Sequence, residues 1–274
     1  MLSLDIAIAT HRQEGIRRLA CEGVLPRIDG VRYVVSWQEH GGMPLPEALA
    51  RRADVEVHRF DGRGQSLNRN NSLDHCKGDL VLVSDDDVDY DTEGLQGLRR
   101  AMEENPAVDV AMFKSVHGDM SRFPSVETPL SLPLPKGYHA SGIEIVVRRK
   151  GEAARLRFCP ELGLASPSMH GGEDEVFLLT AIKRGLVCRF FPVVVCTHQG
   201  ESTGTVASPT REHLRAAGCV IKLYYPATAS LRVVLKAMRM ARAGRTSFGR
   251  ALRHLAAGML AAGSMRRRNT ETLW

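Results

Sequence analysis

The chain has 274 residues, of which 43% are hydrophobic and 25% are charged, and its formal net charge is +6. These values are ordinary for a folded globular protein and exclude an intrinsically disordered chain. The longest apolar stretches, near residues 255–262 and 193–196, are far too short to cross a bilayer. Because the first five residues lack the basic-then-apolar layout of a signal peptide, we expect a cytoplasmic protein.

The basic charge is concentrated in the last part of the chain. Residues 211–274 contain 13 Lys and Arg against 2 Asp and Glu, a net charge of +11. Residues 1–210 contain 24 against 29, a net charge of −5. We therefore expect a domain over residues 1–210 and a basic helical region over residues 211–274. The six cysteines show no CxxC pair and no zinc-site spacing, so we expect buried, reduced thiols.

Strand and helix patterns alternate in the first part of the chain. Short strands are expected at residues 4–9, 31–36, 55–60 and 80–83, with helices near 14–22, 46–52 and 65–76. This alternation predicts an α/β fold with a mostly parallel sheet, whose ligands bind beyond the carboxyl ends of the strands. Segments 10–12, 36–38 and 85–87 are therefore predicted to meet at one edge, around a nucleotide-sized crevice.

The rest of the chain continues this pattern less regularly. A helix is expected at 92–105, with strands at 108–114, at 143–148 and within 187–196. Four prolines between residues 122 and 137 exclude regular structure there, which predicts either a loop over a site or a surface excursion. A Ser- and Gly-rich loop at 165–172 precedes another helix. Two further helices are expected at 231–243 and 248–262.

The clearest chemical signal is LVLVSDDDVDY at residues 80–90, where a buried strand runs into Asp85, Asp86 and Asp87. Adjacent carboxylates in one turn repel each other, and a divalent cation is the usual way to relieve that repulsion. One or two aspartates would suffice to cap the helix expected near residue 92, so three in a row favour metal binding over capping. Oxygen ligands of this kind select Mg²⁺ or Mn²⁺.

A second acidic group begins the helix after Gly171 and Gly172, as Glu173, Asp174 and Glu175. Acidic residues in a first helical turn complement the helix dipole, which requires no catalytic role. An acidic group brought across a crevice from a metal site is also what a general base for a hydroxyl nucleophile requires. The residues alone leave both interpretations open.

His198 follows an apolar strand pattern and precedes a loop rich in Gly, Ser and Thr. A single histidine at a strand end is usually structural. In a chain that also carries an aspartate cluster typical of metal binding, His198 becomes a candidate third ligand.

Five blocks in this order resemble the family 2 glycosyltransferases of the GT-A fold, over roughly residues 3–205. They are IATHR in the first strand, GRGQSLNRNNSL at 62–73, VSDDD, which looks like the family's DxD motif, GGEDE, and THQGESTG at 197–204. Each block alone is weakly specific, whereas five in order are strongly specific. The resemblance implies a Rossmann-like GT-A domain. It also implies an enzyme that moves a sugar from a nucleotide sugar to an acceptor hydroxyl with inversion at the anomeric carbon.

The same resemblance implies which residues bind the donor. Thr10 and Arg12 would line the nucleotide pocket, with Asp86 beside them. Trp37 or Gln38 would lie near the base. Arg69 would approach the diphosphate or hold the loop.

The resemblance likewise implies the metal site and the base. Asp87 would bind Mn²⁺ or Mg²⁺ directly, and Asp85 would contact the metal or the ribose. His198 matches an occasional metal ligand of the family, and Asp174 matches its catalytic base. His11 departs from the family, which usually has Tyr or Phe there.

The implied partners are a nucleotide-sugar donor and a saccharide or lipid-linked acceptor, in polysaccharide or glycolipid assembly of the bacterial type. Two alternatives are a nucleotidyltransferase of the same fold and a non-enzymatic module that binds anionic surfaces or nucleic acid. The Gly-rich basic loop that a sugar-nucleotide pyrophosphorylase needs after its first strand is missing. A haloacid-dehalogenase phosphatase would carry Asp-x-Asp there instead of Ala9, Thr10 and His11. Aromatic residues make up only 5% of the chain, so nucleic acid is not expected as a partner.

The basic tail has its own pattern. Arg232, Lys236 and Arg239 fall at i, i+4 and i+7 and would form one stripe along a helix, and three arginines follow at 266–268. One interpretation is a solvated face on helices that pack against the first domain. The other is peripheral attachment to the anionic inner face of a membrane.

Overall fold

The computed structural model describes residues 1–117, 120–167, 169–198 and 209–273. Its strands are β1 (Leu4–His11), β2 (Val31–Gln38), β3 (Val55–Phe60), β4 (Leu80–Asp85), β5 (Val88–Tyr90), β6 (Val110–Val116), β7 (Thr128–Pro129), β8 (Ile145–Arg148) and β9 (Cys188–His198). Its α-helices are α1 (Arg12–Leu19), α2 (Glu47–Ala50), α3 (Gln65–His75), α4 (Thr92–Glu104), α5 (Glu173–Lys183), α6 (Arg211–Tyr224), α7 (Ala229–Arg242) and α8 (Phe248–Arg268). Short 3₁₀ turns lie at Met120–Arg122, Gly142–Glu144 and Gly151–Arg155.

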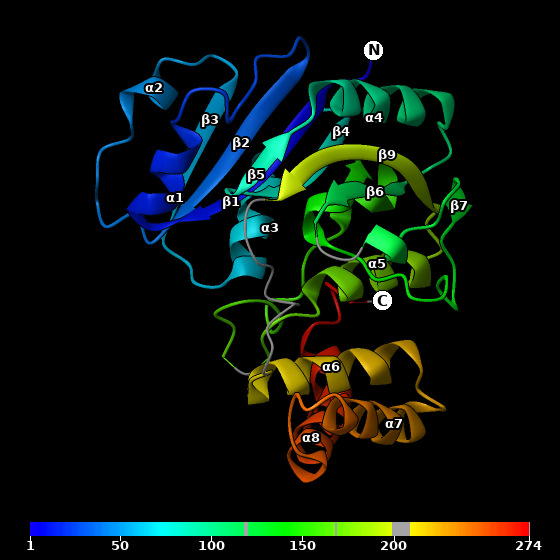
Figure 1. The fold of residues 1–274 in the computed structure, drawn as a ribbon. Coiled ribbons are helices and arrows are strands. Elements are labelled where there is room, and N and C mark those ends of the chain that lie inside the picture. Colours follow the sequence, from blue (N-terminus) through cyan, green and yellow to red (C-terminus); the bar gives the residue numbers. More distant parts are fainter. Residues whose placement is uncertain (118–119, 168, 199–208, 274) are drawn as a thin grey trace.

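One sheet contains all the strands, in the order β3-β2-β1-β4-β8-β6-β9-β5, with β7 paired to β9 (Figure 1). Strands β1 to β4 are parallel, and β6 is parallel to β9. Strand β8 runs antiparallel to both of its neighbours. The prediction of an α/β fold with a mostly parallel sheet is confirmed.

Alternating side chains of the central strands enter two separate cores. Ile6 and Ile8 of β1 pack in the core that also contains Leu95 and Leu98 of α4. Ala7, between them, packs in the core that contains Phe177 of α5. Because a strand buried on both faces has no polar side, its sequence reads as the continuous apolar runs seen in β1 and β4. Helices therefore cover both faces of the sheet.

Strand β7 corrects the expectation that residues 122–137 contain no regular structure. Thr128 and Pro129 pair antiparallel with Phe190 and Arg189 of β9. Proline is tolerated at the edge of a sheet, because the position of its missing N–H can face away from the neighbouring strand.

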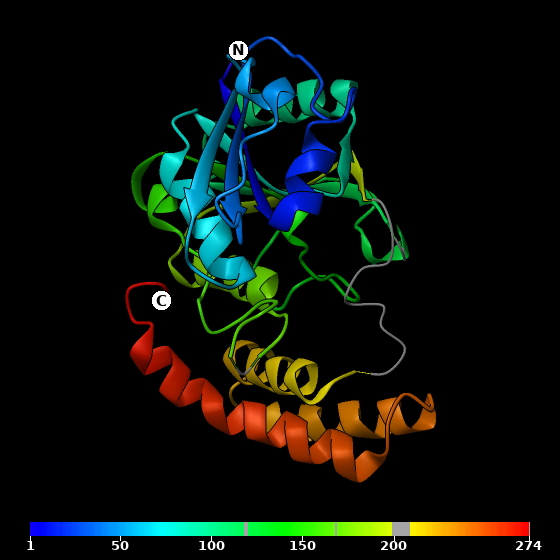
Figure 2. The ribbon, with the colours of Figure 1, turned by 90° about the vertical axis from the view of Figure 1, so that its left-hand side faces the viewer.

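The tail contains three helices rather than the two expected, because α6 was not predicted. Side chains of α6 and α8, including Cys219 and Met265, share a core with Val176 and Leu179 of α5. The basic region therefore packs beneath the sheet domain, as both ribbon views show (Figure 1, Figure 2). A Cβ added at Gly218 would lie 1.9 Å from the carbonyl oxygen of Leu255, so the close crossing of α6 and α8 requires glycine.

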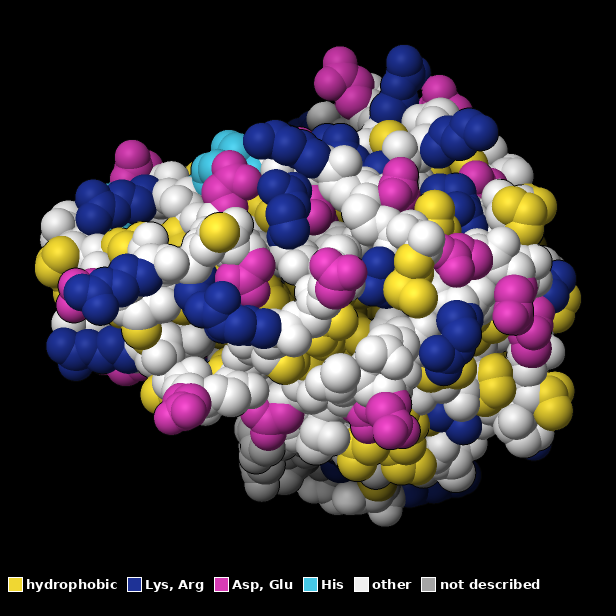
Figure 3. Space-filling model, turned by 90° about the horizontal axis from the view of Figure 1, so that it is seen from above, with side chains coloured by type: hydrophobic (Ala, Val, Ile, Leu, Met, Phe, Trp, Pro, Cys, Tyr) yellow, Lys and Arg dark blue, Asp and Glu magenta, His cyan; other side chains and the backbone are white. Residues whose placement is uncertain are grey.

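Charged side chains of both signs cover the face of the molecule away from the tail helices. Seen from the side away from the tail helices, acidic and basic side chains are interspersed, with no large region of one sign (Figure 3). The net charge of +11 lies in the tail, from residue 211 onward. No helix in the described part of the chain is long and apolar enough to span a bilayer.

Candidate active site

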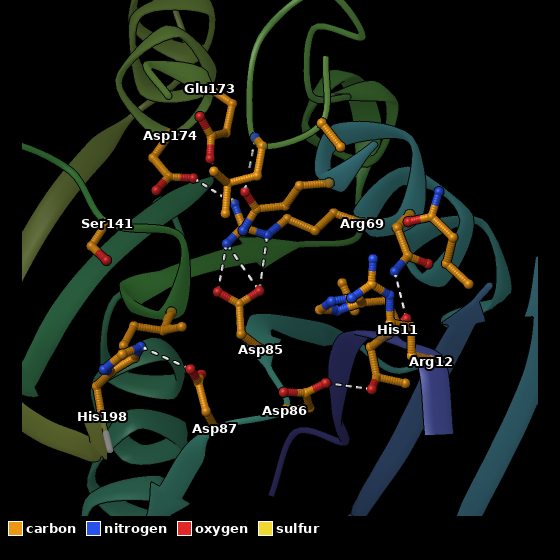
Figure 4. A pocket seen from close by; sticks show the side chains of 18 of the residues that line it. His11, Arg12, Arg69, Asp85, Asp86, Asp87, Ser141, Glu173, Asp174 and His198 are labelled. Carbon is orange, nitrogen blue, oxygen red and sulfur yellow. Dashed lines mark hydrogen bonds and ion pairs between the residues drawn. The ribbon is translucent and has the colours of Figure 1, made fainter. Parts of the chain in front are cut away.

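A cavity of about 400 Å³ lies at the carboxyl ends of β1, β2 and β4. The three segments predicted to meet there do so. Its lining includes Thr10, Arg12, Gln38, Asp85 to Asp87, Arg69, Asp174 and His198 (Figure 4). The cavity is within the size range of small-molecule sites, about 300–1,000 Å³.

The aspartate turn does not cap the following helix. Strand β4 ends at Asp85, and Asp86 and Asp87 form the turn before β5. The cap of α4 is Asp91, whose side chain accepts a hydrogen bond of 2.7 Å from the backbone N–H of Gly94. The capping alternative for the cluster is therefore wrong, and all three aspartates line the cavity.

Arg69 of α3 joins the two acidic groups of the site (Figure 4). Its Nη2 donates to both oxygens of Asp85, at 2.8 and 3.0 Å, and its Nη1 donates to Oδ1 of Asp174 at 2.8 Å. The arginine side chain is only 2% exposed. A Cβ added at Gly142 would lie 2.7 Å from Nη2, so glycine leaves room for the guanidinium. The structure shows Arg69 holding two carboxylates, and its predicted contact with a diphosphate or with the loop stays a prediction.

Asp174 lies in the first turn of α5, behind a left-handed Gly172 with φ of 82°. Burial raises the pKa of its carboxyl above the usual aspartate value of 3.8. Beside it, burial and the charge of Asp174 raise the pKa of Glu173 to about 8. Arg69 stays charged, and the two adjacent carboxyls titrate as a pair beside it. A raised pKa in a cavity is what a general base near neutral pH requires.

Asp86 anchors the aspartate turn to the first strand. Its Oδ2 accepts a hydrogen bond from the Thr10 hydroxyl, and its Oδ1 lies 2.8 Å from Nη1 of Arg18. Burial raises the pKa of Asp86, and the Thr10 hydrogen bond acts in the opposite direction. The Thr10 hydroxyl and both oxygens of Asp86 are therefore already hydrogen-bonded within the protein, which leaves fewer polar atoms for a ligand. Arg18 was not singled out in the sequence, because a basic residue late in a helix is ordinary.

Asp87 and His198 form the other half of the site. Nε2 of His198 lies 3.3 Å from Oδ2 of Asp87. In the described part of the chain, Oδ1 of Asp87 and Nδ1 of His198 are buried without a hydrogen-bond partner. Burial, together with the charge of Asp85, raises the pKa of Asp87. Polar atoms left unpaired in a buried site indicate an absent ligand or ion.

These residues fit a divalent cation. Asp87 and His198 supply a carboxylate oxygen and an imidazole nitrogen, and both have an atom that lacks a partner. Asp85 is engaged by Arg69, so Asp87 is the aspartate better placed for direct binding. Among the described residues, no three His, Cys, Asp or Glu side chains are already grouped as metal ligands.

Trp37 lies in the hydrophobic core and not beside the predicted base site. Its side chain is completely buried and does not line the cavity. Its indole Nε1 donates 2.8 Å to the carbonyl oxygen of Arg12. Arg12 has a φ of 57°, so Trp37 supports the unusual backbone between β1 and α1. Of the two residues predicted to lie near the base, Gln38 lines the cavity and Trp37 does not, and contact with a base stays a prediction.

Arg122 and His117 line the cavity, and neither was predicted. Arg122 is ion-paired with buried Glu144, and both come from the irregular middle of the chain. His117 directly follows β6 and lies against His198, with ring centroids 4.7 Å apart. Burial and the neighbouring His198 lower the pKa of His117. The sequence signal that could have predicted His117 is its position directly after an apolar strand. Residues 199–204 of the THQGESTG block lie outside the described residues.

Comparisons with known proteins find one matching family model and several solved structures of similar fold. The model of glycosyl transferase family 2 matches residues 45–159, which include Arg69 and the aspartate turn but end before Asp174. The structure of S. aureus TarS 1–349 in complex with UDP is similar, with 15% sequence identity and a TM-score of 0.58. That alignment covers 96% of this chain and 92% of the TarS chain. The same protein with UDP-GlcNAc has 16% identity and a TM-score of 0.56, over 99% and 88% of the two chains. No curated protein matches the sequence.

Proposed function

We propose that the chain is a family 2 glycosyltransferase of the GT-A fold, which transfers a sugar from a nucleoside-diphosphate sugar to an acceptor hydroxyl with inversion. The observation that carries this proposal is the pairing of Asp85 and Asp174 through one buried Arg69, inside a single cavity. The donor-side turn and the candidate base are thereby fixed relative to each other. The nucleotidyltransferase and non-enzymatic alternatives lose support, because the family match includes the aspartate turn.

In this proposal Asp174 accepts the proton of the acceptor hydroxyl. Its Oδ1 is held by Arg69, and the carboxylate is oriented toward the cavity (Figure 4). Losing a positioned general base typically costs about 10²- to 10⁴-fold in rate. Asp86, fixed by Thr10 and Arg18, keeps the aspartate turn in place. A divalent cation at Asp87 and His198 would offset the negative charge on the leaving diphosphate.

The donor is tested by thermal stabilisation. Both TarS complexes contain a uridine nucleotide, so UDP and UDP-GlcNAc are the first ligands to test, followed by GDP- and dTDP-sugars. A ligand at a hundred times its Kd stabilises the folded state by about 2.7 kcal/mol. We expect one nucleotide series to raise Tm with Mn²⁺ present and much less in EDTA. Equal rises in Tm with every nucleotide sugar, unchanged by EDTA, would contradict a specific, metal-dependent donor site.

Turnover is expected to fall as the pH falls. Asp174 must be ionised to accept a proton, and burial raises its pKa above the usual 3.8. As the pH decreases through that raised pKa, the ionised fraction and kcat decrease together, at a higher pH than an exposed aspartate would give. The kcat profile should be measured at saturating Mn²⁺ and donor, so that loss of metal does not imitate it. A profile that is flat down to pH 4 would contradict the assignment.

We further propose that the tail helices contact an anionic membrane, near a lipid-linked acceptor. Support comes from the outer side of α7, where Leu231, Val234 and Leu235 are 62%, 37% and 42% exposed. Arg232 and Arg239 are exposed on the same helix. The predicted basic stripe needs one correction, because Lys236 is partly buried and shares a second cavity with Glu175. Apolar side chains flanked by arginines are typical of helices that lie in a membrane interface.

Vesicle co-sedimentation tests the membrane contact. We expect the protein to bind phosphatidylglycerol vesicles at low salt and to dissociate at high salt, because screening weakens surface charges. Each basic residue near the surface contributes about 1 kcal/mol. Replacing three tail arginines by Gln should therefore weaken binding strongly, while a matched triple change on the sheet domain should not. The tail set is Arg232, Arg239 and Arg242, and the matched set is Arg51, Lys150 and Arg155. Equal binding by both variants would contradict the proposal.

A further inference from the structure

Three neighbouring strand ends bring two imidazoles and a carboxylate together. Strands β6 and β9 are parallel, and their ladder ends one residue before His117 and His198. Strand β5 pairs antiparallel with β9 up to His198, and Asp87 is the residue just before β5. His117 and Asp87 therefore lie on either side of His198, and all three line the cavity.

Each of these side chains has a buried polar atom without a hydrogen-bond partner among the described residues. The atoms are Nε2 of His117, Nδ1 of His198 and Oδ1 of Asp87. The two rings meet edge to face, with centroids 4.7 Å apart, and His198 Nε2 is 3.3 Å from Asp87 Oδ2. A buried polar atom without a partner has lost its hydrogen bonds to water and destabilises the folded state. Three of them on adjacent side chains indicate that a bound group completes the site.

We propose that His117 is a third protein ligand for the cation, beside Asp87 and His198, and that the site therefore selects a transition metal over Mg²⁺. This inference rests on the proposed metal-dependent transfer. Imidazole nitrogens bind transition metals, whereas Mg²⁺ takes oxygen ligands almost entirely. Two imidazoles and one carboxylate are the donors of sites for Mn²⁺, Co²⁺ or Zn²⁺.

One separation within the cluster, between His198 Nε2 and Asp87 Oδ2, is consistent with a shared ion. Ligand atoms about 2.1 Å from one metal and at right angles to each other are about 3.0 Å apart. The 3.3 Å between Asp87 and His198 is close to that value. Among the described residues these three side chains do not form a ligand group, so the proposal requires His117 to reorient when the ion binds. The cationic Arg122 nearby is ion-paired with Glu144, which offsets its charge.

Metal binding by the full chain tests this directly, without any turnover. The probe is Mn²⁺ alone, and the readout is electron spin echo modulation on protein carrying ¹⁵N-labelled histidine. We expect two coordinated imidazoles in the parent and one in His117→Ala. Titration should show Mn²⁺ affinity about 10- to 100-fold weaker in His117→Ala. His254→Ala, on the tail helix α8, is the matched control and should bind Mn²⁺ like the parent.

The outcomes separate this inference from the proposed function. Unchanged Mn²⁺ affinity and two coordinated imidazoles in His117→Ala would overturn the role of His117, and transfer by Asp174 with metal at Asp87 would still stand. A defect that appears only when UDP is added would also overturn it, because His117 would then contact the nucleotide. Mg²⁺ binding as tight as Mn²⁺ would overturn the selectivity. Melting curves in EDTA show whether each variant is folded.

Discussion

Asp174→Asn is expected to lower kcat by about 10²- to 10⁴-fold while the affinity for the donor stays within a few-fold of the parent. Asparagine keeps the size of the side chain and can still contact Arg69, but it cannot accept a proton from the acceptor. Donor binding depends on the aspartate turn and the strand ends, which this change leaves in place. Kinetics at saturating donor, with donor affinity from calorimetry, measure the two quantities separately.

Glu175→Gln is the matched control for that change. Glu175 is in the same helical turn but faces the second cavity, with His213 and Lys236. Burial raises its pKa to about 7, so part of it is already neutral near pH 7 and the substitution is mild. We expect kcat within a few-fold of the parent. Equal losses in the two variants would mean that α5 is sensitive to any change and that Asp174 has no special role.

Asp87→Asn is the second change with a large expected effect. A carboxylate is a much stronger metal ligand than an amide, so the variant should bind Mn²⁺ weakly and lose the charge stabilisation of the leaving diphosphate. That stabilisation is several kcal/mol, which is at least about a hundredfold in rate. The parent in EDTA should show a comparable loss, restored by Mn²⁺.

Asp89→Asn controls for changes in the same segment. Asp89 is exposed on β5 and does not line the cavity, so its removal should leave turnover and metal affinity unchanged. Full turnover of the parent in EDTA would contradict the metal proposal. So would an Asp87→Asn variant that is as active as Asp89→Asn.

Much of the fold could be predicted because it depends on local patterns. The continuous apolar runs of β1 and β4 are buried on both faces, and the polar residues that follow them fall at one sheet edge. The position of the cavity follows from that topology alone. Strand β7 and helix α6 were missed for different reasons. A two-residue edge strand has no periodicity, whereas α6 has helix signals of its own that were overlooked, including Thr210 as N-cap and Glu212 in its first turn.

Individual contacts in the site were less predictable, because they depend on side chains that are distant in the sequence. Arg69 contacts Asp174, 105 residues away, and no local pattern encodes that ion pair. Trp37 follows an apolar run at a strand end, which also describes a ligand-binding aromatic, yet its ring is buried. Lys236 matched a helical stripe, but α7 turns it toward Glu175. His117 had a local signal, its position after an apolar strand, but its closeness to His198 follows only from the pairing of β6 with β9.

The stereochemistry of donor cleavage tests the central claim most directly. The chain, with Mn²⁺ and the nucleotide sugar identified by thermal stabilisation, is followed by proton NMR from the first minutes, before the released sugar mutarotates. A single displacement assisted by Asp174 predicts that an α-linked donor first yields the β-sugar, and that Asp174→Asn yields almost none. First release of the α-sugar by the parent, or of the β-sugar at equal rates by both proteins, would contradict inversion with Asp174 as the base.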